Sequence, residues 1–296
     1  KLWNAARFAS LNEANFGLSV PAAKETVNRW IVGETVKTLI EVNIAFDQFR
    51  FNDAAQALYS FVWGTVCDWY VELSKPLLNS SDSKIKNETR QTMGWVIDHC
   101  LILLHPIMPF ITEELWETLS KRNEMLVHCD WPEYDSALID HAADLEMNWV
   151  VNLIESIRSA RAQLRVPAGL KIPMIFLEMD SEAKQAWENN SEMIKKLARI
   201  TELTSADEIP KGSIAISAKG ASFALPLEDI IDVEEEKKLL SKSLDKLQKE
   251  ILALKGRLQN SKFIESAPEE VILETQENLV LREEEEAKLS SAASQL

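Results

Sequence analysis

The fold of this chain is indicated most clearly by a stretch that reads WIVGETVKTLIEVNIAF over residues 30–46. Its apolar residues recur mainly at steps of three and four positions, which is the repeat of an α-helix with one apolar side. That side comprises Trp30, Val36, Leu39, Ile40, Ile44 and Phe46. Because such a helix gains most of its stability by packing its apolar side against other elements, the stretch predicts a helical bundle.

Similar helical patterns surround this stretch and extend the predicted bundle over residues 1–144. A second helix begins before Leu58 and is predicted to end before Pro76, because the residue that precedes a proline disfavours the helical conformation. A third long helix is predicted over residues 84–104. Pro109 then suits the first turn of a short helix.

The periodicity changes in residues 145–232. Residues 171–177, which read KIPMIFL, are typical of a strand, and residues 181–200 are predicted to form a helix. Residues 213–217 and 222–225 flank a short turn and predict a β-hairpin. This part of the chain is therefore predicted to be a small α+β module.

The last part of the chain, residues 233–296, has the seven-residue repeat of a coiled coil. Steps of four and three alternate without interruption between Leu240, Leu244, Leu247, Ile251, Leu254 and Leu258. The sequence SAPE over residues 266–269 is a capping box that opens a second helix. The short connection makes the two helices antiparallel neighbours. The predicted fold is therefore mainly α: a helical bundle, a small α+β module and an antiparallel two-helix coiled coil.

The two predicted helices of the coiled coil carry opposite charges. Residues 237–262 contain eight basic and two acidic side chains, whereas residues 265–296 contain nine acidic and two basic ones. Four of the basic residues form a stripe that faces away from the seam or lies close beside that face: Lys238, Lys242, Lys246 and Lys249. Such a stripe is either a solvated face that pairs with the acidic helix or a surface for a nucleic-acid backbone.

Composition and missing motifs exclude several classes of function. The net charge of −15 over 296 residues argues against a surface covered in phosphate contacts, although it allows positive charge on particular faces. No apolar run is long enough to span a membrane. The chain lacks the glycine-rich nucleotide-binding motifs, the serine-hydrolase elbow and the zinc-protease motif, so we expect no catalytic residues and no catalysis by this chain alone.

The cysteines, histidines and chain start lead to further expectations. Cys67, Cys100 and Cys129 are odd in number and form no Cys-x-x-Cys pair, which favours reduced thiols in a cytoplasmic protein and predicts no metal site. The four histidines show no metal-ligand spacing. We expect a monomer. The start at Lys1, without an initiator methionine, is typical of a piece of a longer chain.

The first predicted helix gathers side chains that suit RNA. At about 100° per residue, Lys1, Asn4 and Phe8 fall within about 60° of one another on the helix. A cation can contact a phosphate, an amide can read a base edge, and an aromatic ring can stack on a base. The alternative is ordinary amphipathic packing with Phe8 in the core.

Several segments together resemble the C-terminal half of the valyl-tRNA synthetase family, which belongs to the class I aminoacyl-tRNA synthetases. The segments in the first half read KLWNAARF (1–8), FVW (61–63) with CDWY (67–70), LHPIMPFITEELW (104–116) and WP (131–132). The first and third of these occur broadly among the class I enzymes for branched aliphatic amino acids. Those closer to the valyl family read IRSAR (157–161) with VP (166–167), and KFI (262–264) with APEEV (267–271). The resemblance covers essentially the whole chain.

The resemblance implies a function and a set of partners. It implies an anticodon-binding bundle with Lys1, Asn4, Arg7 and Phe8 beside the anticodon, and an arm whose basic stripe supports the outer corner of valine tRNA. It also implies a parent enzyme that joins valine to its tRNA with ATP and magnesium. The family's two nucleotide-binding signatures are absent from this chain, so no cofactor is expected here.

Two alternatives remain at this point. The chain could be a coiled-coil scaffold that docks on a protein partner without binding RNA. It could also be the same region of an isoleucyl- or leucyl-type synthetase, although the former usually carries a cysteine-rich zinc element and the latter ends in a different compact domain. The aromatic cluster of Trp63, Trp69 and Tyr70 is predicted to pack the bundle, with RNA stacking as its alternative role.

Overall fold

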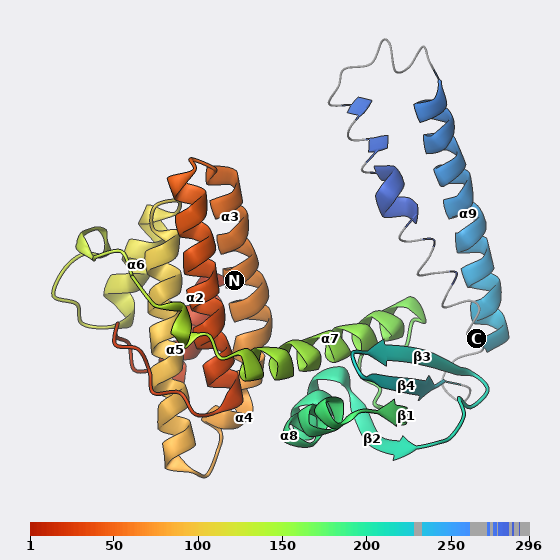
Figure 1. The fold of residues 1–296 in the computed structure, drawn as a ribbon, viewed down its shortest axis with the longest axis horizontal. Coiled ribbons are helices and arrows are strands. Elements are labelled where there is room, and N and C mark those ends of the chain that lie inside the picture. The colour runs from red at the N-terminus through yellow and green to blue at the C-terminus, as the bar shows by residue number, and fades with distance from the viewer. Residues whose placement is uncertain are drawn as a thin grey trace. The chain divides into compact units, whose positions relative to one another are not determined.

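A computed structural model describes residues 1–227 and 233–260, and then residues 271, 272, 275, 276, 278–283, 286 and 290. The side chains of residues 233–240 and of Ser243 are not described. These parts are mostly helical, with one four-stranded sheet (Figure 1). The chain forms two compact units, residues 1–151 and residues 152–296.

The first unit is a bundle of helices, as the sequence predicts. Its helices are α1 (Leu2–Leu11), α2 (Thr26–Asp47), α3 (Phe51–Tyr59), the π-helix η1 (Ser60–Tyr70), α4 (Val71–Leu78), α5 (Ser83–Leu104) and α6 (Pro109–Leu119). Two short 3-10 turns follow, η2 (Leu126–His128) and η3 (Ser136–Leu138). The core lies around α5, whose residues from Thr92 to Leu104 are all buried. Asp82 caps α5 by accepting a hydrogen bond from the backbone N–H of Lys84.

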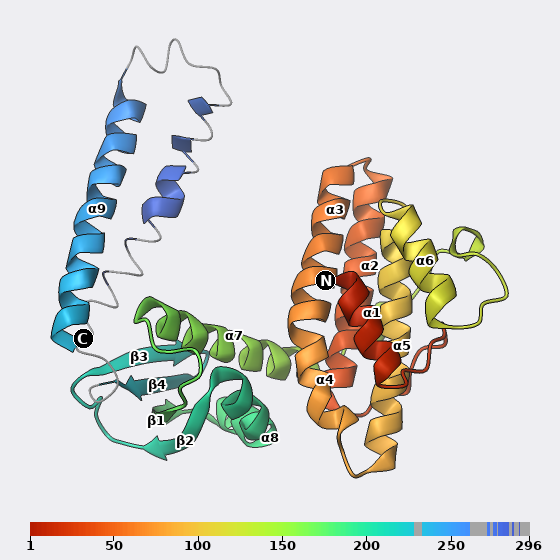
Figure 2. The ribbon, with the colours of Figure 1, turned by 180° about the vertical axis from the view of Figure 1, so that it is seen from behind.

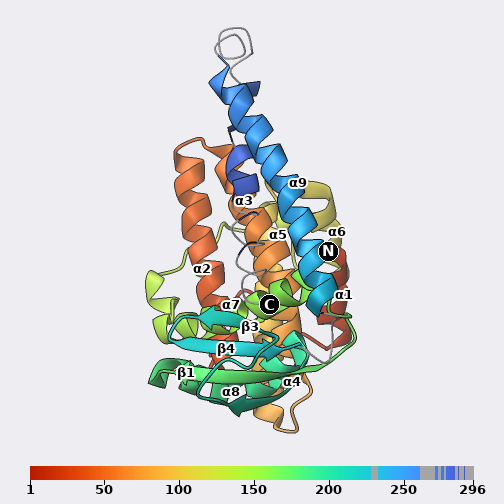
Figure 3. The ribbon, with the colours of Figure 1, turned by 90° about the vertical axis from the view of Figure 1, so that its right-hand side faces the viewer.

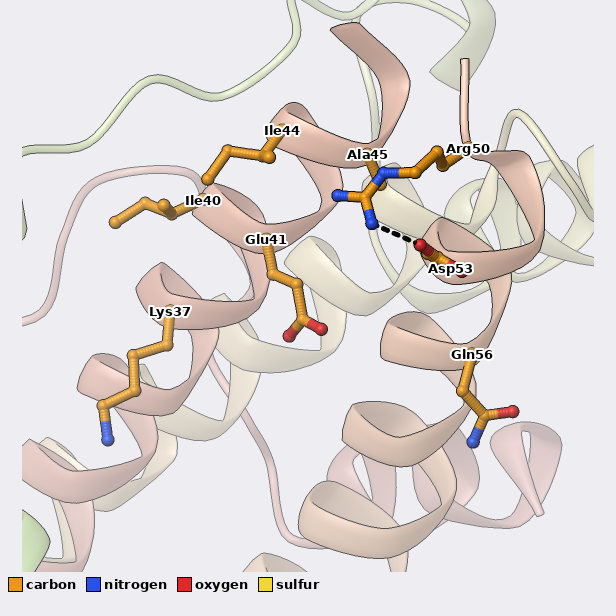
Figure 4. A pocket seen from close by; sticks show the side chains of 8 residues that line it. All are labelled: Lys37, Ile40, Glu41, Ile44, Ala45, Arg50, Asp53 and Gln56. Carbon is orange, nitrogen blue, oxygen red and sulfur yellow. Dashed lines mark hydrogen bonds and ion pairs between the residues drawn. The ribbon is translucent and has the colours of Figure 1, made fainter. Parts of the chain in front are cut away.

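The apolar side of α2 differs from the predicted stripe at two positions. Trp30, Val36 and Leu39 are buried, whereas Ile40 and Ile44 are 36% and 46% exposed. These two isoleucines line a shallow groove of about 470 Å³ between α2 and α3, together with the side chains drawn in Figure 4. Val32, Val42 and Ala45 of α2 are buried instead. The spacing of apolar residues alone does not reveal which of them face the core.

Helices α3, η1 and α4 follow one another without a break in helical conformation. The prediction that the helix ends before Pro76 is therefore wrong, because Pro76 lies inside α4. The helix ends two residues later, at Leu78, so the proline removes a hydrogen bond only from the last turn. Segment η1 has π-helical hydrogen bonds over eleven residues, a rare conformation that is often found at functional sites.

The second unit contains the predicted α+β module. Helix α7 (His141–Gln163) begins within the residues of the first unit and ends within those of the second. The second unit then contains β1 (Ile172–Met179), α8 (Ser181–Ala198), β2 (Ile200–Ser205), β3 (Ser213–Ala218) and β4 (Ala221–Pro226). The strand order is β2-β1-β4-β3, with β1 parallel to β2 and antiparallel to β4. Helix α8 packs on the sheet (Figure 3). The rings of Trp187 and Phe223 lie 6.4 Å apart between them.

The predicted hairpin is confirmed, and one strand was not predicted. Strands β3 and β4 pair in register around Gly220, whose φ of +71° suits glycine. A side chain at this position would collide with Asp180, which caps α8. Four of the six residues of β2 are exposed, so the strand lacks the alternation of buried and exposed positions by which a strand is predicted. The helix predicted over residues 181–200 ends at Ala198, just before β2.

Candidate nucleic-acid interface

The first helix presents its predicted site residues on the side that does not pack. Helix α1 contacts α5, α6 and η1 (Figure 2). Its buried residues are Leu2, Ala5, Ala6 and Ala9. Lys1, Asn4 and Arg7 are exposed, and Phe8 is half-buried. Small alanines let α1 lie close to the bundle, which leaves the larger polar and aromatic side chains on the outer side.

Lys1 is held by an acidic side chain from a distant part of the sequence. Its ammonium group donates to both carboxylate oxygens of Asp68, at 2.8 and 2.7 Å. This hydrogen bond raises the pKa of Lys1, so the group stays positively charged. Both side chains are about half exposed, and such surface ion pairs add little to stability. Their effect is to fix the position of the cation at the N-terminal end of α1.

Phe8 has a cation over its ring that the sequence pattern did not indicate. The Lys75 ammonium lies 5.8 Å from the ring centroid and also pairs with Glu72 on the same helix. Two amines therefore lie at the outer side of α1: Lys1 at its start, and Lys75, which comes from α4 and lies over the Phe8 ring. The only sequence signal for Asp68 was its place in the motif CDWY, and Lys75 had none, because both lie far from α1 in the sequence.

The three residues of the aromatic cluster, Trp63, Trp69 and Tyr70, differ in burial. Tyr70 is buried, as predicted, and burial raises the pKa of its hydroxyl group. Trp63 and Trp69 are only half-buried. Trp63 stacks on Tyr59, with ring centroids 5.3 Å apart and planes 15° from parallel, and Tyr59 is 57% exposed. Tyr59 was not singled out from the sequence.

The predicted arm begins with α9 (Val233–Gln259), and described residues between 271 and 290 are helical as well. Leu247 and Ile251, both on the predicted seam, are buried. Contacts from α9 reach the later residues, with Lys255 to Glu283 at 2.7 Å and Gln248 to Glu286 at 2.9 Å. The antiparallel coiled coil stays a prediction, because residues 261–270, which would form the turn, lie outside the described part of the chain.

The basic stripe on α9 is exposed where it is described. Lys242 and Lys249 are exposed, and among the described residues neither has an ion-pair partner. Lys246 is exposed and lies 3.9 Å from Glu250 on its own helix. The side chain of Lys238 lies outside the described residues. Lys255, which does not belong to the stripe, pairs with Glu283 of the acidic segment.

Other kinds of site find no support in the described residues. No group of three or more His, Cys, Asp or Glu side chains there could hold a metal ion. The three cysteines are free thiols, and burial raises the pKa of Cys100. Within the same residues, no helix is long and apolar enough to cross a membrane.

Family models of known proteins match both parts of the chain that are predicted to bind RNA. A family model described as the anticodon-binding domain of tRNA ligase matches residues 28–176, half of the chain. A second model, described as the valyl tRNA synthetase tRNA binding arm, matches residues 232–296. The first match includes Asp68 and Lys75 but begins after α1.

Curated relatives are similar over the whole chain. The valine–tRNA ligases of Ruegeria pomeroyi, Cereibacter sphaeroides and Caulobacter vibrioides are 59%, 53% and 41% identical to it. Each match covers 100% of this chain and 30%, 30% and 33% of the relative, so the chain spans about a third of their length. The chain belongs to the anticodon-binding family of tRNA ligases and corresponds to the C-terminal tRNA-recognition part of valine–tRNA ligases.

Proposed function

We propose that this chain recognises valine tRNA for a cytoplasmic, monomeric valine–tRNA ligase. In this proposal residues 1–144 bind the anticodon, residues 145–232 form a linking module, and residues 233–296 form the coiled-coil arm that supports the outer corner of the tRNA. The observation that carries the proposal is the outer side of α1. It exposes Lys1, Asn4, Arg7 and part of Phe8 on a bundle whose family is defined by anticodon binding.

The proposed mechanism orients the tRNA through contacts remote from the reaction. Phe8 stacks on an anticodon base, Asn4 reads a base edge, and Lys1 and Arg7 contact phosphates. The arm contacts the backbone and positions the tRNA without reading its sequence. Binding of remote parts of a substrate contributes to orientation at the reacting centre. The negative net charge repels RNA from the other surfaces and so improves selectivity.

The chemistry of the parent enzyme is not assigned to this chain. Valine–tRNA ligases use ATP and magnesium in the catalytic domain, and no group of acidic, histidine or cysteine side chains in the described residues could hold the metal ion. The contribution proposed here is to bind and orient the RNA.

The anticodon proposal predicts that Phe8→Ala weakens the binding of valine tRNA by about 1–3 kcal/mol, the range for loss of one stacked base. Asn4→Ala should also weaken binding through the loss of a base-edge hydrogen bond. Affinity is measured with the full chain by titration of labelled tRNA. Because Phe8 is only half-buried, both variants should keep the melting temperature of the wild type.

The matched control for Phe8 is Phe110→Ala, which removes the same ring from a 90% exposed position on α6. It should leave the affinity unchanged. A large drop in melting temperature for Phe8→Ala with unaltered tRNA affinity would assign Phe8 to the core and reject its role in binding.

The arm proposal predicts a change in the salt dependence of binding. Replacing Lys238, Lys242, Lys246 and Lys249 by glutamine should lower the slope of log affinity against log salt by about 0.7–0.9 for each lost phosphate contact. The arm should stay helical, since glutamine is nearly as good a helix former as lysine. The measurement is a series of tRNA titrations at increasing salt, with circular dichroism as the check on folding.

Lys255→Gln is the matched control for the stripe. It removes one positive charge from the same helix, but from a residue that already pairs with Glu283. Its effect on the salt slope should be smaller than that of Lys242→Gln or Lys249→Gln. An unchanged affinity and salt slope in the fourfold variant would make the stripe a solvated face and favour the scaffold alternative.

The scaffold alternative draws its support from the contacts between α9 and the acidic segment. Lys255 with Glu283 and Arg282 with Glu250 show that part of the basic charge pairs within the chain. A protein complex that is insensitive to salt, with no tRNA binding, would favour this function. The valine–tRNA ligase relatives give no support to the isoleucyl or leucyl alternative.

A further inference from the structure

A stacked aromatic pair lies on the surface of the bundle in the same region as the outer side of α1. Tyr59 and Trp63 stack in parallel, as described above, and Tyr59 remains 57% exposed. Trp63 covers part of one face of the tyrosine ring and fixes its orientation. The exposed part of Tyr59 is therefore a rigid aromatic surface, of the kind on which unpaired bases stack.

The π-helix relates this pair to Asp68, the residue that binds Lys1. Trp63 and Asp68 are five positions apart on η1. In an α-helix five positions correspond to about 140° of rotation, which would place the two side chains on different sides. In a π-helix the hydrogen bonds link residues five apart, so such residues share a side. The unusual conformation thus brings the carboxylate that holds Lys1 onto the side of the helix that carries the aromatic pair.

Lys1 connects the pair to the outer side of α1. Its ammonium group is bound to Asp68 of η1, the π-helix that also carries Trp63. An ion pair this exposed is weak, so a phosphate can replace or share the carboxylate at little cost. A cation beside an exposed aromatic ring matches the backbone and the base of a single RNA strand.

We propose that Tyr59, supported by Trp63, is a second base-stacking platform that continues the α1 surface and takes an unpaired base next to those bound there, with Lys1 on the adjoining phosphate. The inference rests on the proposed anticodon function and adds a residue set to it. Its ligand is a nucleobase in single-stranded RNA, because a base within a duplex has no free face for stacking.

The test uses the full chain and two RNA probes. One is a labelled hairpin with the anticodon loop of a valine tRNA, and the other is a blunt RNA duplex of the same length. Tyr59→Ala should weaken hairpin binding about tenfold, which equals ~1.4 kcal/mol and lies in the range for one stacked base. Tyr59→Phe keeps the ring and should bind within about twofold of the wild type. Phe110→Ala is again the control.

A second measurement locates the stacked base. The fluorescent base 2-aminopurine, which is quenched by stacking, is placed at one loop position at a time. At one loop position, the fluorescence of 2-aminopurine should no longer be quenched by the Tyr59→Ala variant but should still be quenched by the Phe8→Ala variant. Suppose that the wild-type protein binds the hairpin more tightly than the duplex, and that Tyr59→Ala shows the same hairpin affinity and the same quenching as the wild type. The proposed platform at Tyr59 is then rejected, whereas the binding site on α1 is not. If wild-type protein does not prefer the hairpin, the proposed function fails, and the platform with it.

Discussion

Asp98→Ala is expected to lower the free energy of unfolding of the bundle by about 3–5 kcal/mol, the range for breaking a buried ion pair. The Asp98 side chain is completely buried, and both its oxygens accept hydrogen bonds from Arg122, at 2.5 and 3.1 Å. The Arg122 guanidinium also stacks on Trp116, 3.7 Å from the ring centroid. Removing the carboxylate leaves this cation without its anion in a largely dry site. Urea unfolding followed by circular dichroism measures the loss.

Two controls separate burial from charge. Asp53→Ala breaks the exposed pair with Arg50 and should change stability by only about 0–1 kcal/mol. The double variant Asp98→Leu with Arg122→Met should cost much less than the sum of the single changes, because no buried charge is then left unpaired. Strict additivity of the two single changes would show that the ion pair is not the source of the effect.

Acidification from pH 6.5 to pH 4 is expected to cost the bundle about 3 kcal/mol through His99 alone. His99 is 1% exposed, and burial lowers its pKa to about 4. Its Nδ1 donates to the carbonyl of Trp95 at 2.7 Å, and its Nε2 accepts from the Tyr134 hydroxyl at 2.7 Å. The folded protein therefore holds His99 neutral, whereas the unfolded chain takes up a proton below pH 6.5. A depressed folded-state pKa gives stability that is present above pH 6.5 and lost as the pH falls.

The measurement is the free energy of unfolding at several pH values between 7 and 4. His99→Gln keeps a polar side chain there and should flatten the curve over this range, whatever its effect on stability at pH 7. His128→Gln removes an exposed histidine and should leave the slope unchanged. If the free energy of unfolding of His99→Gln falls with pH as steeply as that of the wild type, groups other than His99 cause the acid sensitivity.

Both of these positions stabilise the bundle without being part of the proposed RNA surface. The Asp98–Arg122 pair and the His99–Tyr134 hydrogen bond tie α5 to residues 120–135. Under conditions where the variants remain folded, their affinity for valine tRNA should equal that of the wild type. Phe8→Ala and Tyr59→Ala are expected to lower the affinity for tRNA and to leave the stability unchanged. The two sets of variants therefore distinguish residues of the core from residues of the RNA interface.

Local patterns predicted most of the elements because the signal for each lies within a few turns of chain. The repeat of apolar residues placed α2 and α5, the proline at position 109 began α6, and the hairpin around Gly220 was correct. The failures share a cause. Strand β2 is largely exposed and has no alternation to detect, and Ile40 and Ile44 have helical spacing but no neighbour to bury them.

The candidate RNA surface was predictable only in part. The spacing of Lys1, Asn4 and Phe8 places them together because they share one helix, and the structure leaves that side of α1 outward. Asp68, Lys75 and Tyr59 come from η1, α4 and α3, which lie far from α1 in the sequence, and no local repeat relates them to α1. The packing of α1 on η1 and its neighbours decides which residues of α1 contact side chains from other helices, as Lys1 contacts Asp68 and Phe8 contacts Lys75.

The amino-acid sequence by itself determined that this chain is mainly helical, that a small sheet interrupts the helices, and that its motifs are those of a tRNA-recognition region. It could do so because helix periodicity, turn residues and contiguous motifs are properties of neighbouring positions. The tertiary structure decided the rest: the π-helical segment that aligns Trp63 with Asp68, the pairing of Lys1, and the exposure of Tyr59. These features depend on contacts between segments far apart in the chain, and the burial or charge pairing of a side chain is set by what packs against it.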